Sequence, residues 1–114
     1  MIDWNKFNEY LGYYDDSLKL EVIEMFINNS PAMITALRKN VEQKDFPQLD
    51  INAHTLKSNC KTFGSVEATR LALKLELMGK DKSDEDMAGV LLQLEQEIDQ
   101  LIIELKLYRS KLSS

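Results

Sequence analysis

The segment Ala53-His54-Thr55-Leu56-Lys57-Ser58-Asn59-Cys60-Lys61-Thr62-Phe63-Gly64 decides how this chain is interpreted, and it contains the only histidine. On a helix, each residue advances about 100° around the axis, which divides this segment and the residues before it into two faces. One face carries apolar side chains at the spacing of a buried stripe: Leu49, Ala53, Leu56, Cys60 and Phe63. The other face carries polar and charged side chains: Asp50, His54, Lys57, Ser58 and Lys61. The histidine is therefore predicted to point away from the core.

The same helix has clear start and stop signals. Asp45 is a favourable N-cap, and Pro47 suits the first turn because the missing N–H would have no helical partner there. Gly64 suits the left-handed position that often follows a helix. We therefore expect a helix that begins just after Asp45 and ends near Gly64.

Two helices are expected before this one. A short helix over residues 4 to 11 is too short to be stable alone, so it serves as a lid, with or without a docking role. A second helix is expected from about residue 18 to 43, with Asp16 or Ser17 as its N-cap. Pro31 lies inside it and predicts a kink rather than a break, because the apolar spacing continues on the same face afterwards.

Two helices are expected after it. The first covers roughly residues 66 to 78, and Gly79 is predicted to end it. A charged loop then leads to a long last helix that ends near Lys111. At its start, Ser83 with Asp86 three residues later resembles a capping box.

The last helix has apolar residues alternately four and three apart, which is a heptad pattern. They are Met87, Leu91, Leu94, Ile98, Leu101, Leu105, Tyr108 and Leu112. The pattern indicates either the spine of an antiparallel four-helix bundle or a coiled-coil dimer. Because three other amphipathic helices also need partners, we predict an all-α, up-and-down four-helix bundle with a short extra N-terminal helix. Residues 1–114 would form one domain and a monomer.

Composition narrows the functional classes. A formal net charge of −5 disfavours nonspecific nucleic-acid binding, which depends on Lys and Arg at the phosphates. No apolar run approaches the roughly 20 residues that cross a bilayer, and the N-terminus lacks the apolar segment of a signal peptide. One cysteine cannot form an internal disulfide, so we expect a cytoplasmic protein.

Several chemistries lack the residues that they need. The chain has no glycine-rich phosphate loop, so we expect no ATP site. One histidine and one cysteine do not make a zinc site. Cys60 lies on the core stripe, which favours a buried small side chain over a nucleophile.

The order Ala53-His54-Thr55-Leu56-Lys57-Ser58, followed by Phe63-Gly64, Leu71 and Leu75-Glu76, resembles the signature of histidine-containing phosphotransfer (HPt) domains. The likeness extends more loosely over nearly the whole chain as a pattern of helices. This chain departs from the family at three positions. Ser58 stands where glycine is frequent, and Cys60 and Lys61 stand where small residues such as serine and alanine are common.

The resemblance implies that His54 accepts a phosphoryl group. A neutral imidazole has one ring nitrogen with a free lone pair, which attacks phosphorus without a separate general base. Lys57 lies one turn later, where it either balances charge on the phosphoryl oxygens or is only a solvated surface lysine. Ser58 is expected to matter mainly as a small residue that leaves room for the donor, with its hydroxyl as an additional hydrogen-bonding group.

Three further residues are candidates for supporting roles. Glu76 flanks a buried stripe, and the resemblance implies that it accepts a hydrogen bond from the other ring nitrogen of His54; the alternative is an exposed carboxylate. Lys61 either steers an acidic partner or is merely solvated. Lys80 follows Glu76 by four residues and is expected near the same end of the fourth helix.

The implied function is a phosphorelay intermediate rather than a kinase. His54 would accept the phosphoryl group from a receiver-domain aspartyl phosphate and pass it to another receiver. The implied partners are response-regulator receiver domains and a hybrid histidine kinase, and the receiver would supply Mg²⁺ because the chain is expected to have no cofactor of its own. The start at Met1 and the polar end favour a complete small protein. The alternative is an HPt-like binding module that is never phosphorylated, which the three departures motivate.

Overall fold

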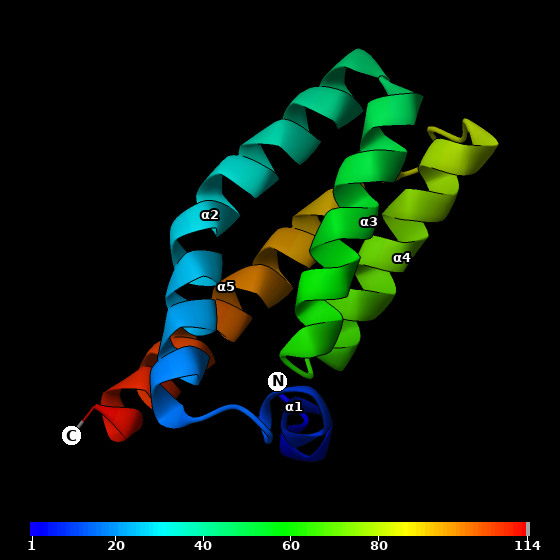
Figure 1. The fold of residues 1–114 in the computed structure, drawn as a ribbon. Helices are drawn as coiled ribbons and strands as arrows, with labels where there is room; N and C mark the ends of the chain where they lie inside the picture. Colours follow the sequence, from blue (N-terminus) through cyan, green and yellow to red (C-terminus); the bar gives the residue numbers. More distant parts are fainter. Residues whose placement is uncertain (114) are drawn as a thin grey trace.

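Five helices make up the part of the chain that the computed structural model describes, residues 1–113 (Figure 1). They are α1 (Trp4–Leu11), α2 (Asp16–Gln43), α3 (Phe46–Thr62), α4 (Val66–Asp81) and α5 (Met87–Leu112). The four long helices form a bundle in which α3 packs on α2 and α4, and α5 closes the ring by packing on the same two helices. The prediction of an all-α four-helix bundle with a short extra N-terminal helix is confirmed.

The heptad pattern of α5 lies in the core of this bundle. The six heptad residues from Met87 to Leu105 are buried, and Tyr108 and Leu112 at the end are partly buried. Burying one large apolar side chain contributes about 1.5–3 kcal/mol, so this seam is a main source of stability. The seam packs against α2 and α4 of the same chain, as the bundle interpretation predicted.

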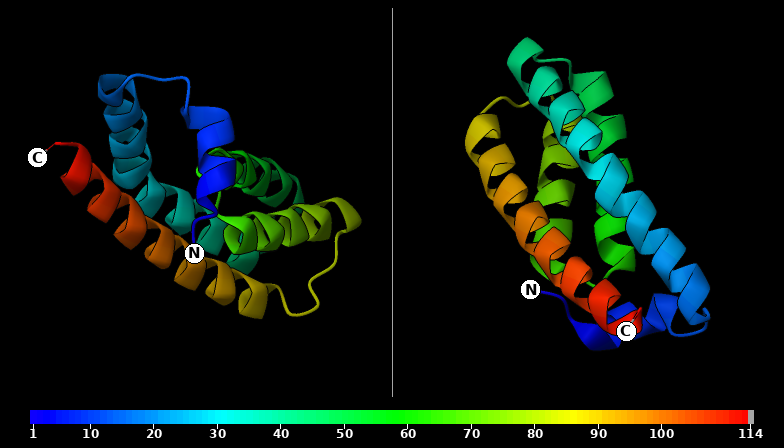
Figure 2. Two further views of the ribbon diagram at one scale, coloured as in Figure 1. Left: turned by 90° about the horizontal axis from the view of Figure 1, so that it is seen from below. Right: turned by 90° about the vertical axis from the view of Figure 1, so that its left-hand side faces the viewer.

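The short helix α1 lies across one end of the bundle, beside the turn that joins α3 to α4 (Figures 1 and 2). Its own side chains Phe7 and Leu11 are buried against the bundle, whereas Trp4 and Tyr10 are 42% and 43% exposed. Gly64 allows this close approach. It has φ +75°, and a Cβ there would lie 2.5 Å from the backbone oxygen of Asp3, the N-cap of α1. The helix is a lid that also presents aromatic side chains to solvent.

The start of α2 differs from the prediction. The N-cap is Asp15, whose side chain accepts a hydrogen bond from the backbone N–H of Leu18 at 2.8 Å. The predicted caps, Asp16 and Ser17, lie in the first turn instead. The helix continues through Pro31 without a break, as the continuous apolar spacing predicted.

The end of α4 was also predicted wrongly. The helix passes through Gly79 and ends at Asp81, where Lys82 takes the left-handed C-cap conformation. Gly79 is buried where α4 meets α3, and a Cβ there would lie 2.9 Å from the carbonyl oxygen of Phe46 and 2.8 Å from the backbone nitrogen of Asp50. This glycine therefore allows close helix packing and does not terminate the helix.

The predicted capping box before α5 is wrong as well. Asp86 is itself the residue before the helix, with φ 58°, and its side chain makes no capping hydrogen bond. The backbone N–H of Ser83 instead bonds the carbonyl of Met78 at 3.0 Å, which continues the C-terminal turn of α4. A left-handed residue at the start of α5 cannot adopt the extended backbone that a capping box needs.

Candidate functional site

His54 lies in the middle of α3, on the face that points away from the core. Leu49, Ala53, Leu56 and Cys60 are buried on the opposite face and fix the rotation of the helix. The His54 side chain is consequently 60% exposed. An imidazole with this exposure is within reach of another protein.

A buried carboxylate holds the imidazole from the neighbouring helix. Glu76 comes from α4, and its side chain is only 5% exposed. Its Oε2 lies 2.8 Å from Nδ1 of His54, and its Oε1 accepts a hydrogen bond from Nζ of Lys57 at 3.0 Å. The alternative of an exposed carboxylate is wrong, and the predicted contact between Glu76 and the ring is present.

The charge of Glu76 determines which ring nitrogen of His54 is free. Burial acts to raise the pKa of the Glu76 carboxyl, but the hydrogen bonds and charges of Lys57 and His54 outweigh it and lower the pKa below its ordinary 4.5. The carboxylate is thus ionised at neutral pH and only accepts hydrogen bonds. Nδ1 of His54 must then carry the hydrogen, so a neutral ring has its lone pair on Nε2.

Three other predicted site residues lie on α3, on the same side as His54, and differ in their contacts and exposure. Lys57 is not a freely solvated lysine, because its side chain is 22% exposed and bound to Glu76. Ser58 is exposed, and its hydroxyl donates to the backbone carbonyl of His54 at 3.2 Å. Lys61 is exposed one turn beyond Lys57 on the same face.

Lys80 belongs to a separate contact. Its ammonium donates to both carboxylate oxygens of Asp50, at 2.9 and 3.2 Å, which ties the end of α4 to the start of α3. Asp50 lies one helical turn before His54. Lys80 therefore reinforces the packing of α3 on α4, and its ammonium is also attracted by the charge of Glu76.

Cys60 is confirmed as a core residue. Its side chain is fully buried, and burial raises the pKa of the thiol to about 12. A thiol with this pKa stays protonated at neutral pH, so it is not a nucleophile.

Two other features concern the described residues, 1–113: a membrane-spanning helix and a metal site. None of the helices combines the length and the apolarity needed to cross a membrane. Within the same residues, no group of three or more His, Cys, Asp or Glu side chains is placed to hold a metal ion.

Comparison with protein families decides the class of this site. The family model described as Hpt domain matches residues 21–104, which include His54 and Glu76. The chain belongs to the HPt domain family. The matched region covers α3 and α4 entirely and leaves α1 outside. No curated protein and no solved structure gives a significant match to the chain.

HPt domains act in phosphorelays by histidine phosphotransfer, together with receiver domains and kinases. His54, Lys57 and Glu76 are separate candidates in the sequence, and this HPt domain joins them in one hydrogen-bonded group. The ion pair between Lys57 and Glu76 was not predicted. The bond depends on the distance between α3 and α4, for which the sequence carries no local signal.

Replacing Glu76 with glutamine should make the free energy of unfolding less dependent on pH. A carboxyl group whose pKa is lowered by folding stabilises the folded state above its unfolded pKa, and this contribution disappears as the pH falls through the folded pKa. Glu76→Gln should therefore unfold at lower urea than wild type at pH 7, and the difference should vanish progressively below about pH 4.5.

The matched control is Glu67→Gln on the same helix. Glu67 is exposed, and the ion pair that lowers its pKa is with Arg70, which is exposed too, so solvent screening leaves little change expected at any pH. Urea unfolding of the three proteins across pH 3–7 makes the comparison. A stability difference for Glu76→Gln that did not depend on pH would contradict the assigned ionised carboxylate.

Proposed function

We propose that this HPt domain accepts a phosphoryl group on Nε2 of His54 from the aspartyl phosphate of a receiver domain and passes it to the aspartate of a second receiver. The observation that most supports the proposal is the pairing of an exposed imidazole with a buried, ionised carboxylate on its Nδ1 side. This arrangement leaves Nε2 as the nitrogen available to a visiting protein.

The transfer needs few groups from this chain. Nε2 of His54 attacks phosphorus, the Nε2–P bond forms, and the bond from phosphorus to the receiver's aspartyl oxygen breaks to release a carboxylate. The hydrogen on Nδ1 remains between the ring and Glu76, whose negative charge stabilises the positive charge that develops on the imidazole. The second transfer runs the same bonds in reverse, toward the aspartate of the next receiver.

Lys57 supplies the positive charge on this side of the reaction. Its ammonium is bound to Oε1 of Glu76 at 3.0 Å and lies one turn from His54. A change of side-chain rotamer brings it toward phosphoryl oxygens on Nε2, where it offsets their charge. The Mg²⁺ that the reaction uses is held by the acidic pocket of the receiver.

The deciding experiment mixes the purified protein with receiver domains that carry labelled aspartyl phosphate. We expect label to move to this chain in a linkage that is stable to alkali and labile to acid, as a phosphohistidine is. A set of receivers from the source organism is needed, because the donor is not specified by the histidine itself. Absence of transfer from every receiver tested would contradict the proposal.

Replacing Lys57 with alanine should slow transfer about tenfold, which corresponds to about 1.4 kcal/mol of lost transition-state stabilisation. The fold should survive, because the side chain lies at the edge of the bundle and Leu56 beside it still holds α3 in place. Rapid-quench measurement of transfer from a labelled receiver tests this, with Lys106→Ala on the exposed side of α5 as the control. A wild-type rate for Lys57→Ala would show that Lys57 is only a surface residue.

A further inference from the structure

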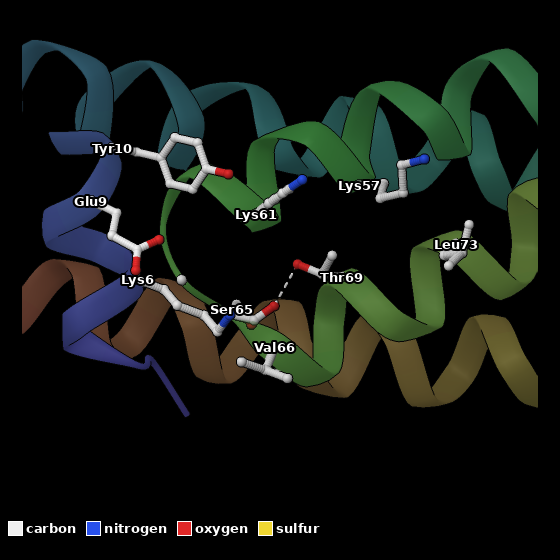
Figure 3. A pocket seen from close by; sticks show the side chains of 10 residues that line it. Lys6, Glu9, Tyr10, Lys57, Lys61, Ser65, Val66, Thr69 and Leu73 are labelled. Carbon is white, nitrogen blue, oxygen red and sulfur yellow. Dashed lines mark hydrogen bonds between the residues drawn. The ribbon is translucent and has the colours of Figure 1, made fainter.

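A groove runs from the phosphoryl-accepting site toward the lid helix. It has a volume of about 330 Å³ and is formed by α1, α3 and α4 (Figure 3). Lys57 and Lys61 line it from α3, and α1 closes the end farther from Lys57. Because Lys57 belongs both to this groove and to the hydrogen-bonded group of His54, the groove is continuous with the site.

The groove is positively charged on a protein that is acidic as a whole. The chain has a net charge of −5, yet the groove is lined by three lysines, Lys6, Lys57 and Lys61, and by one acidic residue, Glu9. Within residues 1–113, neither Lys6 nor Lys61 forms an ion pair. Unpaired lysines around a groove favour a partner with acidic side chains.

The wall of the groove is apolar and exposed. Val66 and Leu73 on α4 are 46% and 40% exposed, and Tyr10 on α1 is 43% exposed. Leu77, one turn beyond Leu73, continues this apolar line along α4 outside the groove. None of these positions belongs to the buried stripe of α4, so packing within the bundle does not account for them.

The groove is close enough to His54 to be covered by a partner protein that reaches the imidazole. Lys61 is seven residues from His54, or about 10 Å along the helix axis. A standard protein interface covers about 800 Å² on each partner, which is roughly 30 Å across. A receiver centred on His54 therefore extends over the groove.

A second groove, on the other flank of α3, offers less to an acidic partner. It lies between α2 and α3, has a volume of about 200 Å³, and is lined only by uncharged residues. The hydrogen bonds from His54 and Lys57 to Glu76 also draw both side chains toward α4 rather than α2. Charge and side-chain direction both favour the flank formed by α1 and α4.

We propose that the donor receiver domain docks in the groove between α1, α3 and α4, with an apolar side chain against Leu73 and acidic side chains against Lys6 and Lys61. The inference rests on the proposed function and adds to it the surface that selects the partner. In this arrangement, α1 acts as part of the docking surface as well as the lid of the bundle.

The test compares two phosphoryl donors on the same variants. The first is the labelled receiver domain that transfers fastest to wild type. The second is phosphoramidate, whose P–N bond breaks and releases ammonia as the Nε2–P bond of His54 forms, without any docking surface. Leu73→Ala should raise KM for the receiver about tenfold with little change in kcat, and Lys61→Glu should do the same and weaken the salt dependence of transfer. Phosphorylation by phosphoramidate should be unchanged in both.

Matched controls come from elsewhere on the surface. Met25→Ala removes a side chain that is 58% exposed in the rival groove between α2 and α3, and Lys106→Glu reverses a charge on α5. Both should transfer like wild type with either donor.

The outcomes separate the two proposals. Normal receiver kinetics in Leu73→Ala and Lys61→Glu, or a larger defect in Met25→Ala, would overturn the docking inference alone. Failure of every receiver to phosphorylate the wild-type protein would overturn the proposed function and the docking inference together. Equal defects with both donors would show that Leu73 and Lys61 support the site itself rather than docking.

Discussion

Replacing His54 with glutamine is expected to reduce phosphorylation by at least about a thousandfold, to background, because the side chain that forms the covalent bond is removed. Glutamine keeps a polar side chain of similar reach, but its amide nitrogen does not attack phosphorus. The chain has no other histidine, so no second imidazole can accept the group. Acid-labile label after incubation with a labelled receiver is the measurement.

The variant should remain folded and should still bind the receiver. His54 is 60% exposed and contributes no core contact, so thermal unfolding followed by circular dichroism should change little. Equal acid-labile label in wild type and His54→Gln would end the proposal of phosphotransfer. Receiver binding that is equal in both, without phosphohistidine in the wild type, would instead support the binding-module alternative.

Replacing Gly79 with alanine should destabilise the bundle, although alanine normally favours a helix. A Cβ at this position would lie 2.8 Å from the Asp50 nitrogen and 2.9 Å from the Phe46 oxygen, both backbone atoms that move only with α3. Overpacking of this kind costs about 1–3 kcal/mol, against a gain of about 1 kcal/mol in helix propensity. Because Glu76 lies one turn before Gly79, the shift of α4 should also weaken its contact with His54 and slow transfer.

Gly89→Ala is the matched control. The three atoms nearest to a Cβ added at Gly89 in α5 all belong to the end of the Asp86 side chain, which can rotate away. This substitution should be neutral or stabilise by up to about 1 kcal/mol. The two variants should therefore differ by about 2 kcal/mol, or roughly 10 °C in Tm. Similar unfolding temperatures for both would show that α3 and α4 tolerate a wider separation at Gly79.

Local patterns predicted most of the fold, and the failure at Gly79 shows what such patterns miss. The heptad of α5, the cap at Asp45 and the left-handed Gly64 depend on residues close together in the chain, and each lies where it was expected. Gly79 was taken for a helix terminator because glycine has two structural uses, ending a helix and admitting a second helix. Which use applies depends on whether another backbone lies against it, and that is a property of the packed bundle.

The same division holds for the site. The exposure of His54 on a helix follows from the sequence alone, because the apolar stripe from Leu49 to Cys60 leaves only one way for α3 to face the core. The burial and ionisation of Glu76 between His54 and Lys57, and the gathering of three lysines beside them, depend instead on how the helices pack. Residues in the same helix have relative positions set by its 3.6-residue turn. Residues in different helices take theirs from how closely and at what rotation the helices pack.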